Sequence, residues 1–368
     1  MAAKEKRVLQ FCHSYYGPFL DCARQYAALF EGTGYKVTTV FLTGEKDPEV
    51  AAGCHSDEVI FLGFSTRAVR GLKLGAIRAM RKLAAERNFS FCIAHRVKPM
   101  YVACWATGLP VFGISHSYGD YLRPGRRLFA RLFRDRLHLL GVSDSVRDEI
   151  RQCMPTWPED RLHTLYNRID VAAVQAQQVG RGEARQVLGL SPDAWVVGNV
   201  GRLHPDKDQH TLLRGFAAAK TQLPDNACLA IMGAGRLEQE LKTLASTLGL
   251  GNQVVFLGQV ADGRRYFKAF DVFALSSDHE PFGMVLLEAM AAGLPLIVSD
   301  CGGAPEVVGD LGLRFPFGDD QALATALVKA VAALPSTEQW LQRLQDKFSD
   351  QAVRQQFWQM SAVKQLTD

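Results

Sequence analysis

The sequence has few cysteines, and none of them stands in a motif. Eight cysteines are scattered along 368 residues, with no C-x-x-C pair and no Cys/His cluster at the spacing of zinc ligands. This pattern excludes the common zinc modules and gives no sign of a disulfide framework. We therefore expect no bound metal and a reducing compartment, the cytoplasm.

A long apolar run is also missing. The N-terminal residues MAAKEKRVLQFCHS pass from charges straight into a short strand, without the apolar region and cleavage site of a signal peptide. Residues 99–119 carry no charge, but Gly108, Pro110, Gly113 and His116 interrupt them. We expect a helix, a turn and a buried strand there rather than a membrane-spanning helix.

A strong excess of one charge is absent as well. The net charge of +4 gives no reason to expect nucleic acid as a partner. The charges are unevenly divided, because residues 1–170 hold 25 Lys and Arg against 17 Asp and Glu, and the remainder holds 17 against 21. The first half is therefore basic, and the second is mildly acidic. A composition of 48% hydrophobic and 22% charged residues is typical of a globular protein.

Short apolar runs alternate with longer helical patterns in two successive series. This alternation predicts α/β architecture: two doubly wound, Rossmann-like parallel-sheet domains that face each other across a cleft. We place the boundary in the polar stretch 167–193, which gives an N-terminal domain of residues 1–170 and a C-terminal domain of residues 171–347. Segment 348–368 has apolar residues at helical spacing, and we expect it to pack back on the first domain.

Two cations follow the first strand of the second series, in GNVGRLHPDKDQHTLL. Arg202 and Lys207 lie in a loop between a strand and a helix N-terminus, where charge and the helix dipole together suit a diphosphate. A solvated loop is the alternative. The next turn, IMGAG, contains Gly233 and Gly235 but lacks the third glycine of a dinucleotide fingerprint, so it indicates either a tight turn or a close backbone approach to a nucleotide.

One carboxylate interrupts the apolar segment EPFGMVLLEAMAAGLPLIVSD. Because proline is favoured at the first helical position, we expect a helix from Pro281, with Glu280 at its N-terminus and Glu288 about 12 Å further along. An unpartnered buried carboxylate is costly, so Glu288 needs a structural partner or a ligand with hydrogen-bond donors. A capping role is the structural alternative for Glu280.

Histidines stand at the ends of three strands of the first series. His13, His95 and His116 stand where ligand-binding residues of such sheets lie, and Arg96 and Lys98 follow His95. The cations suit an anionic acceptor. Two basic helical stretches, 66–87 and 123–136, combine apolar and cationic residues, which fits either an anionic membrane surface or an ordinary amphipathic surface helix.

Together these motifs resemble the retaining glycosyltransferases of family 4, which have the GT-B fold of two facing Rossmann-like domains. The most specific part is the E-x7-E spacing of Glu280 and Glu288, with GGAPEVV following. GRLHPDK and VVFLGQV are the next most specific parts, and the resemblance covers nearly the whole chain. The AHRVKP element and the basic first half look most like enzymes that build lipopolysaccharide core or related surface glycans.

The resemblance implies a role for each matching residue. Arg202 and Lys207 would hold the donor diphosphate, Glu288 the ribose hydroxyls and Glu280 the donor sugar, with His116 near the transferred sugar. The family's glycine loop has two adjacent glycines, whereas this chain has YYGPF. The predicted sets are catalytic His116, Arg202, Lys207 and Glu280; donor-binding Gly17, Gly233, Val260, Phe282, Gly283, Met284 and Glu288; and acceptor-binding His13, His95, Arg96 and Lys98.

The implied reaction is retaining transfer of a hexose-type sugar from a nucleotide diphosphate sugar, a UDP-sugar above all, to a glycan or glycolipid acceptor. No cofactor and no metal are expected, because the two cations and the helix dipole neutralise the leaving diphosphate. The enzyme would be cytoplasmic and peripheral on the inner face of the membrane. The alternatives are a nucleotide-sugar 2-epimerase and a membrane-surface binding protein with a degenerate nucleotide pocket.

Overall fold

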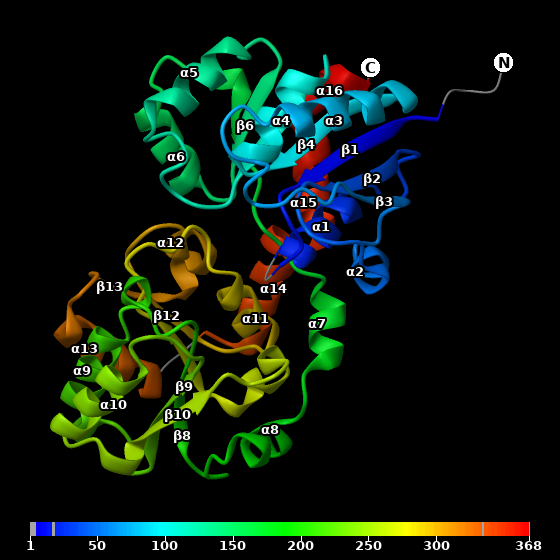
Figure 1. Cartoon of the computed structure of the whole chain (residues 1–368). Coiled ribbons are helices and arrows are strands. Elements are labelled where there is room, and N and C mark those ends of the chain that lie inside the picture. The colour runs from blue at the N-terminus through cyan, green and yellow to red at the C-terminus, as the bar shows by residue number, and fades with distance from the viewer. Residues whose placement is uncertain (1–4, 17–18, 333–334, 368) are drawn as a thin grey trace. The chain divides into compact units, whose positions relative to one another are not determined.

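The computed structural model describes residues 5–16, 19–332 and 335–367. The chain divides into two compact units, of which unit 1 comprises Met1–Asn167 with Asp350–Asp368, and unit 2 comprises Arg168–Ser349. Each unit is an α/β domain with its own sheet (Figure 1).

Within the described residues, unit 1 contains a seven-stranded parallel sheet in the order β3-β2-β1-β4-β5-β6-β7. The strands are β1 Arg7–Cys12, β2 Lys36–Phe41, β3 Glu58–Phe61, β4 Phe89–His95, β5 Val111–Ser115, β6 Leu137–Gly141 and β7 Leu162–Thr164. The helices are α1 Phe19–Ala27, α2 Pro48–Gly53, α3 Leu74–Glu86, α4 Val97–Ala106, α5 Pro124–Leu132, α6 Asp144–Cys153, α15 Asp350–Gln359 and α16 Ser361–Thr367.

Unit 2 has, over its described residues, a six-stranded parallel sheet in the order β10-β9-β8-β11-β12-β13. The strands are β8 Trp195–Val200, β9 Ala227–Met232, β10 Val254–Gly258, β11 Val272–Leu275, β12 Leu296–Ser299 and β13 Leu313–Phe315. The helices are α7 Val171–Gln177, α8 Arg181–Leu188, α9 Gln209–Ala219, α10 Glu238–Thr247, α11 Met284–Ala291, α12 Ala304–Val308, α13 Asp320–Ala332 and α14 Thr337–Phe348.

The strands are apolar over most of their length because helices cover both faces of a parallel sheet. In β1, Val8, Leu9 and Phe11 are fully buried. The side chain of the buried Gln10 ties β1 to α1, since its Nε2 donates to the carbonyl oxygen of Ala23 at 2.9 Å. Burial of this kind fixes the strand positions and thereby the loops that follow them.

Both sheets reverse their winding direction once, between β1 and β4 in unit 1 and between β8 and β11 in unit 2. Ligands of doubly wound sheets bind at this switch point, outside the carboxyl ends of the strands. His13 follows β1 and His95 ends β4, while Gly201 follows β8 and Ser276 follows β11. The predicted fold class of two Rossmann-like domains is confirmed. In each unit, candidate site residues lie at the switch point of the sheet.

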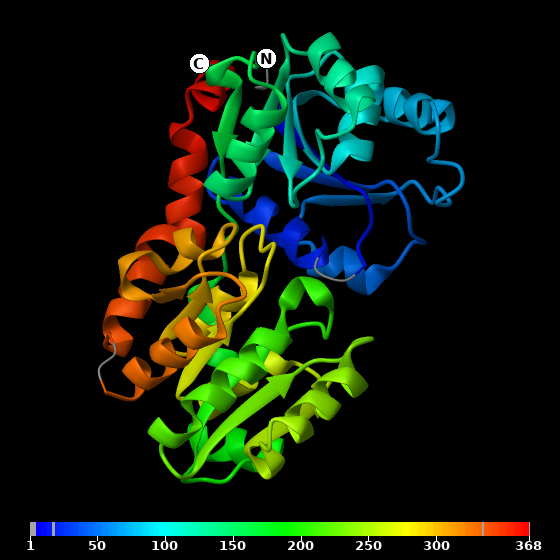
Figure 2. The same cartoon turned by 90° about the vertical axis from the view of Figure 1, so that its left-hand side faces the viewer.

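The C-terminal segment belongs to unit 1, where it appears in red in Figures 1 and 2. Arg354 Nε donates to the carbonyl oxygen of Ala28 at 3.0 Å, and Trp358 Nε1 donates to that of Leu29 at 2.8 Å. The Phe357 ring packs against the Phe30 ring with centroids 5.7 Å apart. Helix α15 thus completes the core of unit 1 on the side of α1.

The two basic stretches differ in what their apolar residues do. Ile77 and Leu83 of α3 are buried, as is Val69 in the preceding turn, so most of the apolar residues of stretch 66–87 serve the core. On α5, Leu128 and Leu132 are 69% and 64% exposed, and stretch 66–87 exposes Leu72 and Leu74 to 67% and 57%. Stretch 123–136 differs in that its two exposed leucines lie four residues apart within one helix.

Candidate active site

Backbone hydrogen bonds connect the loops at the carboxyl ends of β8, β9 and β10. Gly201 N donates to the carbonyl oxygen of Met232 at 3.0 Å, and Gly233 N donates to that of Gly258 at 2.8 Å. Gly233 has φ of +145°, and a Cβ atom on it would lie 1.9 Å from the carbonyl oxygen of Gly201. Only glycine fits here, so the IMGAG turn lets two backbone segments of the protein approach each other.

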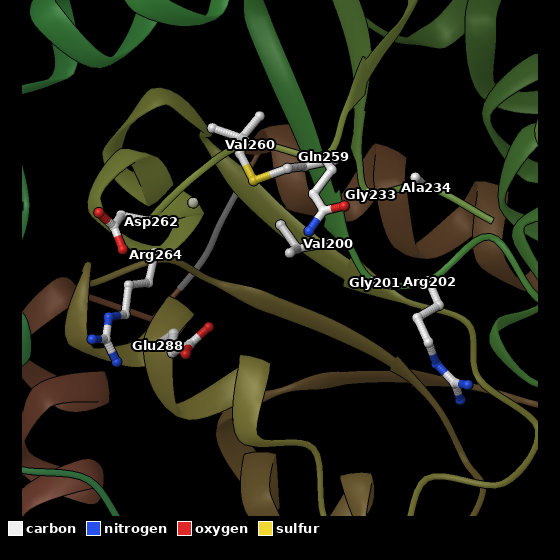
Figure 3. Close-up of a pocket in the computed structure, with 12 residues that line it drawn as sticks. Val200, Gly201, Arg202, Gly233, Ala234, Gln259, Val260, Asp262, Arg264 and Glu288 are labelled. Atoms are coloured by element: carbon white, nitrogen blue, oxygen red, sulfur yellow. The ribbon is translucent and has the colours of Figure 1, made fainter. Parts of the chain in front are cut away.

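These loops and α11 enclose a pocket of about 440 Å³ in unit 2. Figure 3 shows Glu288 near the base of the pocket, with Arg264 on one side and Arg202 on the other. Four of the predicted site residues meet here: Arg202, Gly233, Val260 and Glu288. The other lining residues are Val200, Gly201, Met232, Ala234, Gln259, Asp262, Gly263 and Arg264.

Glu288 enters this pocket from the second turn of α11. The predicted helix start at Pro281 is wrong, because α11 begins at Met284 and Gly283 before it has φ of +93°, a conformation that favours glycine. Glu288 is partly exposed, whereas its neighbours Leu287 and Ala289 are buried. The side chain is therefore placed at the boundary between an apolar core and a polar cavity.

Arg202 lies in the loop after β8. Its side chain is 69% exposed and forms an ion pair with Asp206, with Nη2 and Oδ2 3.1 Å apart. The Arg202 carbonyl oxygen accepts a hydrogen bond from Gln209 Nε2 at 3.0 Å, which fixes the backbone while the long side chain stays in water. A largely exposed ion pair of this kind is weak and easily exchanged for another anion.

Lys207 and Glu280 form a tight ion pair across the switch point of unit 2. Lys207 Nζ lies 2.6 Å from Glu280 Oε2, and the two side chains are only 17% and 10% exposed. Ser277 Oγ donates to the same carboxylate oxygen at 3.4 Å. Glu280, which follows β11, therefore balances the charge of the largely covered Lys207, which follows β8.

Lys207 lies beside the pocket rather than far from it. A Cβ atom on Gly201, which lines the pocket, would be 3.9 Å from Lys207 Cγ and Cδ. Packing fixes the chain around Phe282. The Phe282 ring is buried and packs edge-on against the Phe348 ring, with centroids 5.6 Å apart. Gly303 N donates to the Glu280 carbonyl oxygen at 2.7 Å, so the GGAPEVV loop holds this segment. Met284 is partly exposed at the first position of α11.

Of the predicted acceptor-binding residues, Arg96 and Lys98 bring positive charge to the end of β4, and this charge acts on His13 at the end of β1. Burial, Lys98 and Arg96 lower the pKa of His13 to about 4. Burial and the neighbouring Arg96 also lower the pKa of the catalytic candidate His116 to about 4. Both imidazoles are therefore neutral near pH 7. Burial, with Arg70 and Arg96 nearby, lowers the pKa of Lys98.

The His95 side chain is too deeply buried to contact a ligand directly. It is 1% exposed, and its Nδ1 is 3.0 Å from Nε2 of His116. Arg96 follows with φ of +73°, an uncommon conformation for a non-glycine residue, at the start of α4. Asp120, which the sequence analysis does not single out, lies close enough to Arg96 and Arg126 that both oppose the rise that burial causes in its pKa.

Gln259, Asp262 and Arg264 also line the pocket, although no sequence motif singles them out. Their signal is the polar run Q-V-A-D-G-R-R directly after β10, but such residues are common in any surface loop. Gly17, the predicted phosphate-loop glycine, lies outside the described residues.

Across the described part of the chain, no group of three His, Cys, Asp or Glu residues is arranged to hold a metal ion. The described helices also include none that is both long and apolar enough to span a bilayer.

Comparison with known proteins identifies the family. Residues 180–346 match the model of "Glycosyl transferases group 1", and residues 21–173 match that of "Glycosyltransferase Family 4". The putative glycosyltransferase EpsF of Bacillus subtilis (strain 168) is 33% identical over 284 residues, which are 72% of each chain. The chain therefore belongs to family 4 of the glycosyltransferases, as the sequence motifs predict.

Other relatives match over a shorter span. The lipopolysaccharide core biosynthesis glycosyltransferase LpsE of Rhizobium meliloti (strain 1021) is 33% identical over 186 residues, covering 49% of this chain and 53% of LpsE. An uncharacterized glycosyltransferase of Methanocaldococcus jannaschii, MJ1607, is 35% identical over 177 residues, 46% of this chain and 44% of that protein. The chain thus spans about half the length of these two relatives.

Solved structures confirm the GT-B fold. A glycosyltransferase from Rickettsia africae ESF-5 superposes with a TM-score of 0.85 at 13% identity and covers 100% of both chains. Anabaena HepE in complex with UDP gives a TM-score of 0.79 at 22% identity, covering 95% of this chain and 98% of HepE. At these identities the likeness concerns the fold alone.

Proposed function

We propose that this glycosyltransferase moves a hexose-type sugar from a UDP-sugar, with retention of anomeric configuration, to a glycan or glycolipid of the lipopolysaccharide-core type. The observation that carries the proposal is the pocket of unit 2, which Glu288 of α11 and Arg202 after β8 both line and beside which Lys207 lies. The name of LpsE and the UDP bound to HepE support the acceptor class and the nucleotide.

The proposed chemistry depends on charge rather than on a protein nucleophile. Glu288 accepts hydrogen bonds from the ribose hydroxyls, and Arg202 and Lys207 neutralise the departing diphosphate. Arg202 supplies a planar fork of donors, and Lys207 a compact charge. Because two cations and the dipole of α9 serve this purpose, the reaction proposed here proceeds without a metal ion.

The proposed location is the cytoplasmic face of a membrane, reached through α5 of unit 1. Leu128 and Leu132 are exposed four residues apart, so they lie on one face of the helix. Arg123, Arg131 and Arg134, which are near them in the sequence, are exposed as well. Apolar side chains among arginines suit the headgroup region of an anionic bilayer.

The test is nucleotide binding and turnover by a pair of variants. Glu288→Gln keeps the size of the side chain but weakens its hydrogen bonds to the ribose, and we expect a loss of about tenfold or more in UDP affinity by calorimetry, since hydrogen bonds to charged groups contribute about 1.5–3 kcal/mol. Glu183→Gln, on α8 of the same unit, is the matched control and should bind UDP normally. Unchanged binding by Glu288→Gln would refute the assignment of the pocket.

Turnover of a panel of nucleotide sugars then separates the reaction classes. A product that requires both the donor and a saccharide acceptor, persists in EDTA and keeps the donor's anomeric configuration supports the proposal. Conversion of the donor alone into a second nucleotide sugar identifies a 2-epimerase instead. Liposome binding without any nucleotide binding identifies a membrane-surface protein with a degenerate pocket.

A further inference from the structure

Two histidines at the switch point of unit 1 form a hydrogen-bonded pair. His95 Nδ1 and His116 Nε2 are 3.0 Å apart. The two rings are inclined by 23°, with centroids 5.3 Å apart. The lone pair and the N–H of an imidazole both lie in the ring plane, so this near-coplanar, edge-to-edge arrangement is the geometry that an N–H···N hydrogen bond requires.

The surrounding core holds His95 in place. Its side chain is 1% exposed. The Tyr26 ring of α1 packs edge-on against it, with centroids 4.5 Å apart and an interplanar angle of 89°. His95 therefore lies behind His116 and has little freedom to turn toward a bound saccharide.

The hydrogen bond to His95 limits the orientations open to His116. The last torsion of a histidine side chain is broad and roughly two-fold, so a ring flip exchanges the positions of carbon and nitrogen at little intrinsic cost. Burial and Arg96 hold the pKa of His116 at about 4, so near neutral pH the ring is uncharged and has one donor and one acceptor nitrogen. With Nε2 engaged by His95, Nδ1 is the nitrogen left for a ligand.

We propose that His95 is a positioning residue, which holds the His116 ring in one orientation and one tautomer through the hydrogen bond between His95 Nδ1 and His116 Nε2. This assignment replaces the acceptor contact that the sequence analysis expects of His95. Its effect on catalysis rests on the proposed function and on the place near the transferred sugar that the family resemblance implies for His116, where Nδ1 would meet a sugar hydroxyl group.

The two ends of the bond are coupled. If His95 Nδ1 carries the proton, His116 Nε2 accepts and its own proton lies on Nδ1. If His116 Nε2 carries the proton, Nδ1 of His116 is an acceptor. Losing the partner removes this coupling, and a ring in the wrong tautomer cannot make the intended hydrogen bond to substrate.

Three substitutions of His95 separate the hydrogen bond from packing. His95→Phe keeps an aromatic ring against Tyr26 but has no nitrogen. His95→Asn places an amide at the position of Nδ1 and can donate or accept there, whereas His95→Gln places it one bond further out. His138→Phe is the control, because His138 is also buried in unit 1, stacked on Phe112 with centroids 5.0 Å apart.

The first readout is the tautomer of His116 by long-range ¹H–¹⁵N NMR of histidine-labelled protein without ligand. We expect one tautomer in the native protein, in His95→Asn and in His138→Phe. A mixture should appear in His95→Phe and His95→Gln. One unchanged tautomer in every variant, or a mixture already in the native protein, would overturn the proposal.

The second readout is steady-state kinetics with the full-length chain. We expect kcat to fall about 10–100-fold in His95→Phe and His95→Gln, the usual effect of losing a residue that orients a functional group, with little change in donor KM. His95→Asn should stay within about fivefold of the native kcat. Equal losses in Asn, Gln and Phe variants would show packing alone and reject positioning. The NMR result stands even if the proposed transfer reaction fails.

Discussion

At the switch point of unit 2, charged side chains neutralise one another, whereas at that of unit 1 cations lie beside neutral imidazoles. Lys207 is paired with Glu280 and Arg202 with Asp206. In unit 1, Arg96 contributes to the lowered pKa values of both His13 and His116. The same fold thus prepares two different environments at the equivalent place in its sheets.

The difference indicates how each unit would select a ligand. In unit 2, an incoming diphosphate has to displace carboxylates from cations that already have partners, which favours a ligand with more than one negative charge. In unit 1, neutral imidazoles can exchange hydrogen bonds with hydroxyl groups, and Arg96 and Lys98 supply positive charge nearby. Under the proposed function, unit 2 would take the nucleotide diphosphate and unit 1 a saccharide with anionic groups.

The largest expected effect comes from breaking the ion pair of unit 2. Lys207→Met removes a cation from the proposed diphosphate site and leaves Glu280 buried without its lysine. We expect kcat to fall about 10³-fold and the free energy of unfolding to fall by about 3–5 kcal/mol.

Enzyme assays and denaturant unfolding measure the two effects of Lys207→Met. Lys242→Met is the matched control, because its exposed pair with Glu238 lies on the surface of α10. The double variant Lys207→Met/Glu280→Gln should regain stability but not activity. Stability that falls further in the double variant would contradict this account of the pair.

The next effect tests whether the pocket of unit 2 depends on close backbone packing. Gly233→Ala would place a methyl group 1.9 Å from the Gly201 carbonyl oxygen. We expect a loss of about 3 kcal/mol or more in the stability of unit 2, as for other overpacked sites. Gly249→Ala separates the two causes, since Gly249 also has positive φ (+65°) but nothing within 4 Å of its Cβ position.

Gly249→Ala should therefore cost only about 1–2 kcal/mol. Hydrogen exchange should show the loss in Gly233→Ala confined to β8–β13, with β1–β7 unchanged. Equal effects of the two alanine substitutions would mean that φ alone explains the requirement for glycine at position 233.

Acid should weaken unit 1 before unit 2. The four histidines whose pKa is lowered among the described residues, His13, His116, His138 and His163, all belong to unit 1. A histidine with a lowered folded pKa binds fewer protons than in the unfolded chain, so its contribution to stability is full above about pH 6.5 and is lost as the pH falls toward 4.

Between pH 7 and 5, we therefore expect the melting transition of unit 1 to fall by several degrees, at about 2–4 °C per kcal/mol for domains of this size. UDP raises only the transition of the unit that binds it, which assigns the two transitions in calorimetry. A parallel fall of both transitions would remove this distinction between the units.

The same contrast explains what the sequence could predict. Two rounds of strand and helix patterns predict the two parallel sheets, because burial on both faces imposes apolar strands. The positions of Arg202 and Glu288 at the pocket follow from strand ends and a lone carboxylate in an apolar helix. Unit 1 has no comparable motif, so its histidines are placed by strand order alone.

The pairing of side chains could not be predicted from the sequence, for a physical reason. Lys207 and Glu280 are 73 residues apart, and the sequence does not specify which cation meets which carboxylate. The start of α11 at Met284 depends on one glycine with positive φ, which outweighs the preference for proline at a first helical position. His95 and His116 both lie at strand ends and look alike in the sequence. Only the structure shows that the His95 ring is buried and the His116 ring is partly exposed.

The smallest effect concerns membrane binding, which we expect of unit 1 and not of unit 2. Replacing exposed Leu128 and Leu132 of α5 by Glu removes apolar area and adds negative charge. We expect the variant to bind anionic liposomes at least about tenfold more weakly than the native protein in sedimentation assays at low salt.

Val187→Glu on α8 of unit 2 is the control, because Val187 is 55% exposed and the substitution also adds a negative charge. Native binding should decline as salt rises, since surface attraction is screened over about 8 Å at physiological ionic strength. An equal loss in Val187→Glu would show that net charge, rather than the leucines of α5, governs the contact.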